Sequence, residues 1–464
     1  MFCQILLQMA TSCKISLKVS ITLVACVGYI IKEKAMKKAL NLWGLLRLPL
    51  SWALGCRKVF FAGAISIVCV GGFASQCLGQ ESNEECNKET CSSKAHNYEI
   101  QGDIERAVAL YKKAIELGDL EAYSYLALLY QEQNNSSLAK HYFQLGCDNS
   151  QYDACFNLGT FFELSRDFRH AQKYYDIACE KGNAKAKANA CHNLGVLYSS
   201  EVVGIERDYD KALKFYQIAC DLDNPKSCGS LGTFYEKGNG GVEQNYARAF
   251  ELYKFACDAG EARACFNLGT LYDRGYGMKQ NFKKAFEVYQ VACNAKHAEA
   301  CNNIGLMYDE GLGVRKSPQK ALEFYKIACD LQSLVACNNL GYLYENESKL
   351  KDRQKAYTYY QMACDMKSAK ACYNLAYLYD TDEENRDVDK AFKLYDTACG
   401  LKDAMACNNL GSLYDKGEGV AQNLEVAKKY YERGCELGAE LGCVNKSMFE
   451  KNHQRIDRRG NNKK

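Results

Sequence analysis

From about residue 120 onwards, hydrophobic and polar positions recur with the periodicity of paired helices. In the first helix of each pair, which we call helix A, Leu, Gly and an aromatic residue keep a fixed spacing, as in Leu268, Gly269 and Tyr272. In the second, helix B, Ala285, Tyr289 and Ala292 are four and three residues apart, which places them on one helical face. The unit recurs every 35 to 37 residues, a length that accommodates two helices.

The boundaries of helix B are predicted by residues that cap helix N-termini. Pro318 follows Ser317, which suits the first helical position because no N–H is needed there. The glycine inside helix A costs about 1 kcal/mol relative to alanine, so we expect another backbone to pass close to it. The predicted N-cap residues are Asp167, Asp208, Asn245, Asn281, Ser317, Asp352, Asp387 and Asn423.

A two-helix unit cannot bury its apolar side alone, so neighbouring units must stack. The predicted fold is therefore all-α, a right-handed α/α solenoid of about ten helix-turn-helix repeats. The presence of only three prolines agrees with a helical chain. We divide it into an N-terminal extension with signal peptide (1–79), cysteine-free repeats (80–150), disulfide-linked repeats (151–438), a C-terminal capping helix (439–453) and an unstructured basic tail (454–464).

The chain has 26 cysteines, and most of them form a regular pattern. One cysteine ends a helix B and another begins the next helix A, where a helix-turn-helix corner would bring them together. Free thiols and metal ligands are the alternatives, but there is no C-x-x-C motif, and the six histidines are scattered. The predicted disulfides join Cys147 with Cys155, Cys179 with Cys191, Cys220 with Cys228, Cys257 with Cys265, Cys293 with Cys301, Cys329 with Cys337, Cys364 with Cys372, Cys399 with Cys407, and Cys435 with Cys443.

Some cysteine positions depart from the pattern. Cys179 and Cys191 are separated by the insertion 184–190, which we expect to add a turn to the next helix. Cys86 and Cys91 have no assigned partners. In the first repeats Ile115 and Tyr123 occupy the cysteine positions, so we expect the N-terminal end to be the less stable one.

The N-terminus predicts export. Arg57 and Lys58 precede an apolar run at 59–74, which is typical of a signal peptide. An over-long gene start before Met36, a membrane anchor at 17–31 and lipidation of Cys77 remain open. Disulfides also need an oxidising compartment, so we expect a secreted or periplasmic protein with membrane contact only through its signal segment. Beyond residue 80 the chain is mildly acidic, which favours no nucleic-acid partner.

The repeated segment, which reads ACNNIGLMYDEGLGVRKSPQKALEFYKIAC at 300–329, resembles Sel-one-like repeats, which are relatives of TPR repeats. With its regular cysteines the chain resembles the Helicobacter cysteine-rich protein family over about residues 95–450. That resemblance implies an exported, disulfide-linked α/α solenoid that contacts host immune cells. It also implies a second function, because some members are described as weak β-lactamases or penicillin-binding proteins.

An asparagine stands two residues after the second cysteine of most pairs. An amide both donates to and accepts from a peptide backbone, and TPR-type proteins bind peptides in this way. We therefore predict binding of a protein or extended peptide on the concave face, which helix A lines in related arrays. The alternative is that each asparagine holds its own helix-start loop. The predicted ligand-binding residues are Asn157, Asn193, Asn267, Asn303, Asn339, Asn374 and Asn409, while Ser230 breaks the series and Asn445 ends it.

The β-lactamase alternative, with a β-lactam or cell-wall peptide as ligand, has weaker support. Its Ser-x-x-Lys motif occurs at Ser137, Ser317 and Ser348, but no S-D-N or K-T-G follows. Ser317 is already explained as a helix cap, and the other two serines fall in predicted loops. We predict no catalytic residue, no metal site and no cofactor, and leave enzymatic activity open.

Overall fold

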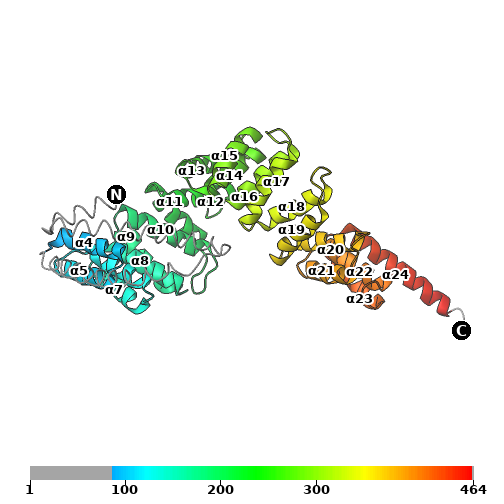
Figure 1. The fold of residues 1–464 in the computed structure, drawn as a ribbon, viewed down its shortest axis with the longest axis horizontal. Coiled ribbons are helices and arrows are strands. Elements are labelled where there is room, and N and C mark those ends of the chain that lie inside the picture. Colours follow the sequence, from blue (N-terminus) through cyan, green and yellow to red (C-terminus); the bar gives the residue numbers. More distant parts are fainter. Residues whose placement is uncertain (1–85, 462–464) are drawn as a thin grey trace, which may run out of the picture. The chain divides into compact units, whose positions relative to one another are not determined.

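The computed structural model describes residues 86–461, and within them it contains 21 helices, α4 to α24, and no β-strand. From α4 to α22, even-numbered helices are helices A and odd-numbered helices are helices B. Figure 1 shows them as successive pairs joined by short loops. The predicted signal segment lies outside the described residues. The helices are α4 (Lys88–Gln101), α5 (Ile104–Glu116), α6 (Glu121–Glu132), α7 (Ser136–Asp148), α8 (Tyr152–Leu164), α9 (Phe168–Lys181), α10 (Ala184–Ser199), α11 (Tyr209–Asp221), α12 (Pro225–Lys237), α13 (Tyr246–Asp258), α14 (Ala262–Arg274), α15 (Phe282–Asn294), α16 (Ala298–Glu310), α17 (Pro318–Asp330), α18 (Leu334–Asn346), α19 (Arg353–Asp365), α20 (Ala369–Thr381), α21 (Val388–Gly400), α22 (Ala404–Lys416), α23 (Leu424–Glu436) and α24 (Glu440–Asn461).

The predicted N-caps of helix B are confirmed. Each of the eight side chains accepts a hydrogen bond from a backbone N–H three residues further on. Asp208, for example, accepts from the N–H of Lys211 at 2.9 Å. Pro318 is the first residue of α17, directly after its cap Ser317. These caps satisfy helix-end N–H groups that would otherwise lack partners, which fixes where each helix B begins.

The core of each repeat is made of small and aromatic side chains from helix B. Ala285, Tyr289 and Ala292 are fully buried, and the same three positions are buried in α17. Each helix A packs against its own helix B, and from α7 onwards each helix B packs against the next helix in the chain. The alternation of alanine and tyrosine lets helices approach closely where alanine lies and fills the space beside it with a ring.

The glycine of helix A has a different neighbour from the one we expected. The prediction of a close backbone was wrong, because the tyrosine ring of helix B lies there. A Cβ added to Gly269 would lie 2.6 Å from Cδ1 of Tyr289. The same relation holds for Gly341 and Tyr360. The glycine is therefore required by a side chain that stacks flat on the helix, rather than by a crossing main chain.

The structure contains all nine predicted disulfides, and each lies at the corner between a helix B and the next helix A. Their Cα atoms are 4.5 to 5.0 Å apart. The nine bonds join Cys147 to Cys155, Cys179 to Cys191, Cys220 to Cys228, Cys257 to Cys265, Cys293 to Cys301, Cys329 to Cys337, Cys364 to Cys372, Cys399 to Cys407, and Cys435 to Cys443.

The second cysteine of each pair is the more deeply buried one in most corners. Cys265, Cys337 and Cys372 have no exposed surface, and the same is true of Cys407. Cys443, at the last corner, is half-buried at the start of α24. These sulfurs therefore form disulfides in the core between repeats. Free thiols and metal ligands were the alternatives.

The insertion before Cys191 changes a helix length and leaves the corner intact. Helix α10 has 16 residues, compared with 13 in α12, and the bond from Cys191 to Cys179 still forms. The added turn therefore extends the helix at its start without displacing the cysteine from the corner.

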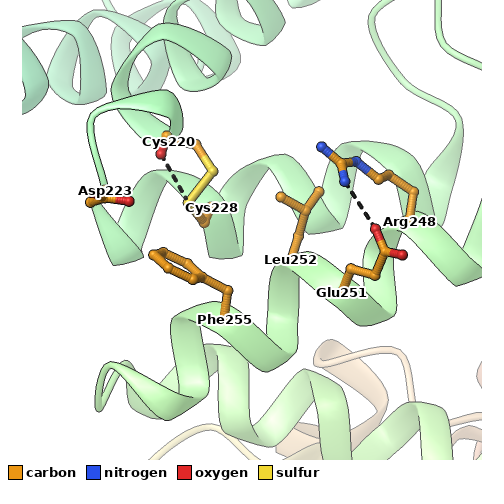
Figure 2. Close-up of a pocket in the computed structure, with 7 residues that line it drawn as sticks. All are labelled: Cys220, Asp223, Cys228, Arg248, Glu251, Leu252 and Phe255. Atoms are coloured by element: carbon orange, nitrogen blue, oxygen red, sulfur yellow. Dashed lines mark hydrogen bonds and ion pairs between the residues drawn. A yellow bond between two sulfur atoms is a disulfide. The ribbon is translucent and has the colours of Figure 1, made fainter.

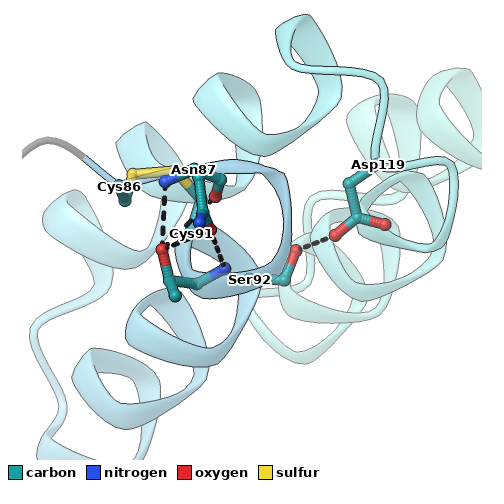
Figure 3. Close-up of a disulfide and its surroundings, with 6 residues drawn as sticks. Cys86, Asn87, Cys91, Ser92 and Asp119 are labelled. Atoms are coloured by element: carbon teal, nitrogen blue, oxygen red, sulfur yellow. Dashed lines mark hydrogen bonds between the residues drawn. A yellow bond between two sulfur atoms is a disulfide. The ribbon is translucent and has the colours of Figure 1, made fainter.

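Helices α4 and α5 belong to a unit separate from the one that begins at Leu120. Cys86 and Cys91, for which no partners were predicted, bond to each other at the start of α4 (Figure 3). Beside them Asn87 accepts from the N–H of Thr90 at 3.0 Å, while the Thr90 hydroxyl accepts from the N–H of Asn87. The description of 80–150 as cysteine-free was wrong, because this disulfide closes the first turn and Cys147 bonds to Cys155. Only the corner between α5 and α6 lacks a disulfide among the described corners between repeats.

The C-terminal helix is longer than predicted. Helix α24 spans Glu440–Asn461 and includes most of the segment that we expected to be an unstructured tail. The physical reason is visible in the sequence, because no proline or glycine interrupts residues 443–459 and the first glycine after them is Gly460. Within the described residues, no helix combines the length and apolar character needed to cross a membrane.

Candidate functional site: the helix A face

The second unit, residues 120–464, has one side on which neighbouring repeats approach most closely. There, helices A of successive repeats contact each other directly, as in α8 with α10 and α16 with α18. The helices B of successive repeats make no comparable contacts within the described part of this unit. We call the surface formed by α6 to α22 (even numbers) the A face, and the opposite surface, formed by helices B, the B face.

All seven predicted asparagines lie on the A face and are half-buried. Two of them hydrogen-bond to an asparagine of the preceding helix A. The Nδ2 atom of Asn339 donates to Oδ1 of Asn302 at 3.0 Å, and Asn374 donates to Asn338 at 2.9 Å. Asn445, at the end of the series, donates to Asn408 at 2.8 Å. These amides therefore connect neighbouring repeats.

The asparagines also reach the buried tyrosines of helix B. Asn267 hydrogen-bonds to the phenol of Tyr253, and Asn303 to that of Tyr289, in each case across the disulfide-linked corner. Ser230, the break in the series, makes the equivalent bond to Tyr216. The alternative in which each asparagine holds its own helix-start loop does not describe these bonds. The partners are a tyrosine and an asparagine of the preceding repeat.

A column of carboxylates runs beside the asparagines and was not predicted from the sequence. Each stands four residues after the glycine or alanine of its helix A and is half-buried. Glu236 accepts from the Tyr253 hydroxyl at 2.6 Å, and Glu345 from the Tyr360 hydroxyl at 2.7 Å. The signal was a recurring Asp or Glu after the Leu-Gly pair. The column consists of Glu163, Glu236, Asp273, Asp309, Glu345, Asp380 and Asp415.

Burial and these contacts set the titration of the column. Burial raises the pKa of Tyr289 to about 12, and the nearby Asp273 adds to the increase. Burial likewise raises the pKa of Tyr360, helped by its hydrogen bond to Glu345. Burial also raises the pKa of Asp273 and Asp309 above the ordinary value for aspartate. The phenols remain neutral donors over the physiological pH range, so the A face presents fixed hydrogen-bond donors and carboxylates at the spacing of the repeat.

The three Ser-x-x-Lys motifs do not form a catalytic pair. Ser317 caps α17, and the amine of Lys320 lies 5.0 Å from the ring centroid of Tyr308. Ser137 lies in the first turn of α7, not in the predicted loop, and Lys140 lies over the Phe162 ring at 4.9 Å. Ser348 falls in the loop after α18, as predicted. In these motifs, Lys140 and Lys320 face aromatic rings.

A metal site and a small-molecule pocket have little support in the described part of the chain. It contains no group of three or more His, Cys, Asp or Glu side chains that could hold a metal ion. A shallow hollow of about 210 Å³ lies beside the Cys220–Cys228 disulfide, with Leu252 and Phe255 on its floor (Figure 2). Arg248 and Glu251 at its edge form an ion pair at 2.9 Å. The hollow is open, and Arg248 and Glu251 already pair with each other, so it offers little to a small ligand.

Comparison with known proteins agrees with the repeat geometry. The Sel1 repeat model matches nine segments, and a tetratricopeptide repeat model matches residues 89–117. The chain belongs to the Sel1 repeat family. The first Sel1 match coincides with α6 and α7, one repeat earlier than the start expected for the disulfide-linked series. The matched segments are 120–150, 153–183, 188–224, 225–261, 262–297, 298–333, 334–368, 369–403 and 404–438.

Solved structures include other Sel1 repeat proteins. A protective antigen of uropathogenic Escherichia coli is 22% identical, with a TM-score of 0.61 over 79% of this chain and 80% of its own, which shows the shared fold. Helicobacter pylori cysteine-rich protein B is 32% identical over 28% of this chain and 94% of its own, with a TM-score of 0.24. The resemblance to the Helicobacter cysteine-rich proteins is confirmed by the Sel1 matches together with the regular disulfides. A search of curated proteins found no match.

Proposed function

We propose that this Sel1 repeat protein binds an extended segment of a partner protein along the A face of residues 120–445. The observation that carries the proposal is the row of half-exposed amides and carboxylates, present together in most repeats and held in place by buried tyrosines. An extended peptide has a backbone donor and acceptor at every residue, so a row of fixed polar groups suits it. The disulfides support the same function, since a pre-ordered surface loses less entropy on binding.

The cysteine pattern supports an oxidising location, either extracellular or periplasmic. We propose export through the segment at 59–74. A partner outside the cell is then expected, and the description of the Escherichia coli relative as a protective antigen supports a surface exposed to a host. No arrangement in the described residues favours β-lactam hydrolysis, so binding is the function that we propose.

The test compares the two faces. A library of unstructured 12-residue peptides with unbiased composition would be selected against the oxidised protein without its first 79 residues. The expected result is a set of peptides whose affinity falls when Thr270→Arg or Leu306→Arg blocks the A face, and is unchanged by Val291→Arg or Ile327→Arg on the B face. Enrichment of no peptide, or equal sensitivity to both pairs of variants, would overturn the proposal.

A further inference from the structure

The A face is not uniform along the stack, and its most distinctive part spans α16, α18 and α20. There the residue after the glycine position is large and apolar: Leu306, Tyr342 and Tyr377. In α8, α12 and α14 the same position holds threonine and in α22 serine, while α6 and α10 hold the isolated Leu128 and Val196. Tyr342 and Tyr377 are 57% and 47% exposed, more than the exposed tyrosines Tyr125, Tyr209 and Tyr276 outside this region. We call these three residues, with Asp309, Glu345 and Asp380, the acidic aromatic patch.

The members of this patch lie together. The phenols of Tyr342 and Tyr360 are close enough to affect each other, and Glu345 bonds to Tyr360 at 2.7 Å. In the next repeat, which contains α20 and α21, Tyr377 and Asp380 are likewise close enough to affect the phenol of Tyr395. Hydrogen bonds between side-chain amides, Asn339 to Asn302 and Asn374 to Asn338, join helices α16, α18 and α20. The rings and carboxylates therefore belong to one continuous surface.

The charge of this region is distinctive as well. The last residue of helix A stands seven positions after the residue of the asparagine series, so both lie on the same helical face. That last residue is Lys237 in α12 and Arg274 in α14, but Glu310 in α16 and uncharged in α18 and α20. At this position the A face thus changes from a cation to an anion between α14 and α16.

Few cations offset this negative charge. Lys370 lies at the start of α20, with its amine 4.9 Å from the ring centroid of Tyr373. Lys316 attracts Asp309, and Glu347 repels it, so these two loop residues act on it in opposite directions. Arg386 forms an ion pair with Asp380 at 3.6 Å, which leaves Asp309 and Glu345 as half-buried carboxylates one repeat apart. A carboxylate held partly out of water gains more from an added cation than a fully solvated one does.

From this surface we infer that the bound partner is an extended peptide in which Lys or Arg alternates with apolar residues, seated on the acidic aromatic patch. The cations would meet Asp309 and Glu345. The apolar residues would cover Leu306, Tyr342 and Tyr377, whose rings also attract cations over their faces. This inference rests on the proposed function and names the chemistry of the partner. A peptide of about 12 residues, roughly 40 Å long when extended, crosses three helices spaced about 8–10 Å apart.

The test uses two fluorescein-labelled 12-residue peptides, one repeating Lys-Ser-Leu and the other Glu-Ser-Leu, titrated by fluorescence anisotropy against the oxidised protein without residues 1–79. We expect the lysine peptide to bind and the glutamate peptide not to bind. Replacing both Tyr342 and Tyr377 with alanine should weaken binding at least about 10-fold without changing net charge. Tyr276→Ala is the matched control, because Tyr276 is also exposed but lies after α14, outside the patch.

The outcomes separate the two proposals. If the lysine peptide binds equally well to the double tyrosine variant, attraction is non-specific and the inference fails. If the peptides selected from the unbiased library bind through the A face but are acidic or uncharged, the inference fails while the proposed function stands. If no peptide from the library or from this pair binds, both proposals fail. Circular dichroism of the double variant establishes that its helices are intact.

Discussion

The ring of Tyr325 lies against the backbone of Gly305, and a Cβ added to Gly305 would lie 2.5 Å from Cδ1 of Tyr325. Similar contacts recur between the helix A glycine and the helix B tyrosine in most repeats, with a closest approach of 2.5 to 2.9 Å to the ring. The flat contact positions the phenol at the A face, where it meets the carboxylate column. The glycine is thus part of the arrangement that builds the candidate binding surface.

Gly305→Ala should destabilise the protein. Overpacking of a close contact costs about 1–3 kcal/mol, whereas alanine gains only about 1 kcal/mol over glycine in a helix. Gly400→Ala is the matched control, because nothing lies within 4 Å of a Cβ at that helix end. The midpoint of chemical denaturation should fall for the first variant and stay or rise for the second. Equal midpoints would mean that the ring contact is not tight in solution.

Asn339→Ala should lower stability through its partner. Asn302 is 6% exposed, and the substitution removes the donor to its Oδ1 atom. A buried polar group left without a partner costs about 1–3 kcal/mol. Asn346→Ala, at an exposed asparagine that donates to the carbonyl of Tyr342, should change stability by less than about 0.5 kcal/mol. Thermal unfolding would measure both, and an Asn339 variant as stable as the control would contradict the connecting role of the asparagines.

Reduction of the disulfides should destabilise corners selectively. By the loop-entropy relation, a bridge across eight residues contributes about 2–3 kcal/mol. Hydrogen exchange should therefore accelerate at the corner 294–298, next to Cys293–Cys301, when a reductant is added. The corner 117–120 serves as internal control, since Ile115 and Tyr123 occupy the cysteine positions there. Similar acceleration at both corners would show that reduction unfolds the chain globally.

His192 should make stability depend on pH. Burial, followed by the charge of Lys226, lowers its pKa to about 4, and its Nδ1 lies 2.8 Å from the Ser227 hydroxyl. Because the unfolded histidine titrates near 6.5, the unfolded state binds the proton first, and the stabilising contribution present above pH 6.5 is lost as pH falls towards 4. The melting temperature of the wild type should fall more steeply between pH 7 and 4.5 than that of His192→Gln. Parallel curves would contradict this assignment.

The helix pairs, their caps and the disulfides could be predicted because each is specified by residues that recur in register. Asn281, for example, needs only a backbone N–H three residues away, which any helix start provides. Contacts between helices could not be predicted in the same way. Asn339 and Asn302 are 37 residues apart, and Gly305 indicates only that something lies close, without saying that it is the ring of Tyr325. The carboxylates were visible as a recurring acid, but their role depends on tyrosines that only the fold brings to them.

The central claim is that a partner binds on the A face, and site-specific photo-crosslinking tests it most directly. A photoreactive phenylalanine analogue would replace Tyr342 on the A face or Met362 on the B face, two side chains that are 57% and 41% exposed. Each variant, still disulfide-bonded, would be irradiated with the same peptide selected from the unbiased library. We expect crosslinks from position 342 and none above background from 362. Crosslinks of equal yield from both positions, or from 362 alone, would contradict the claim.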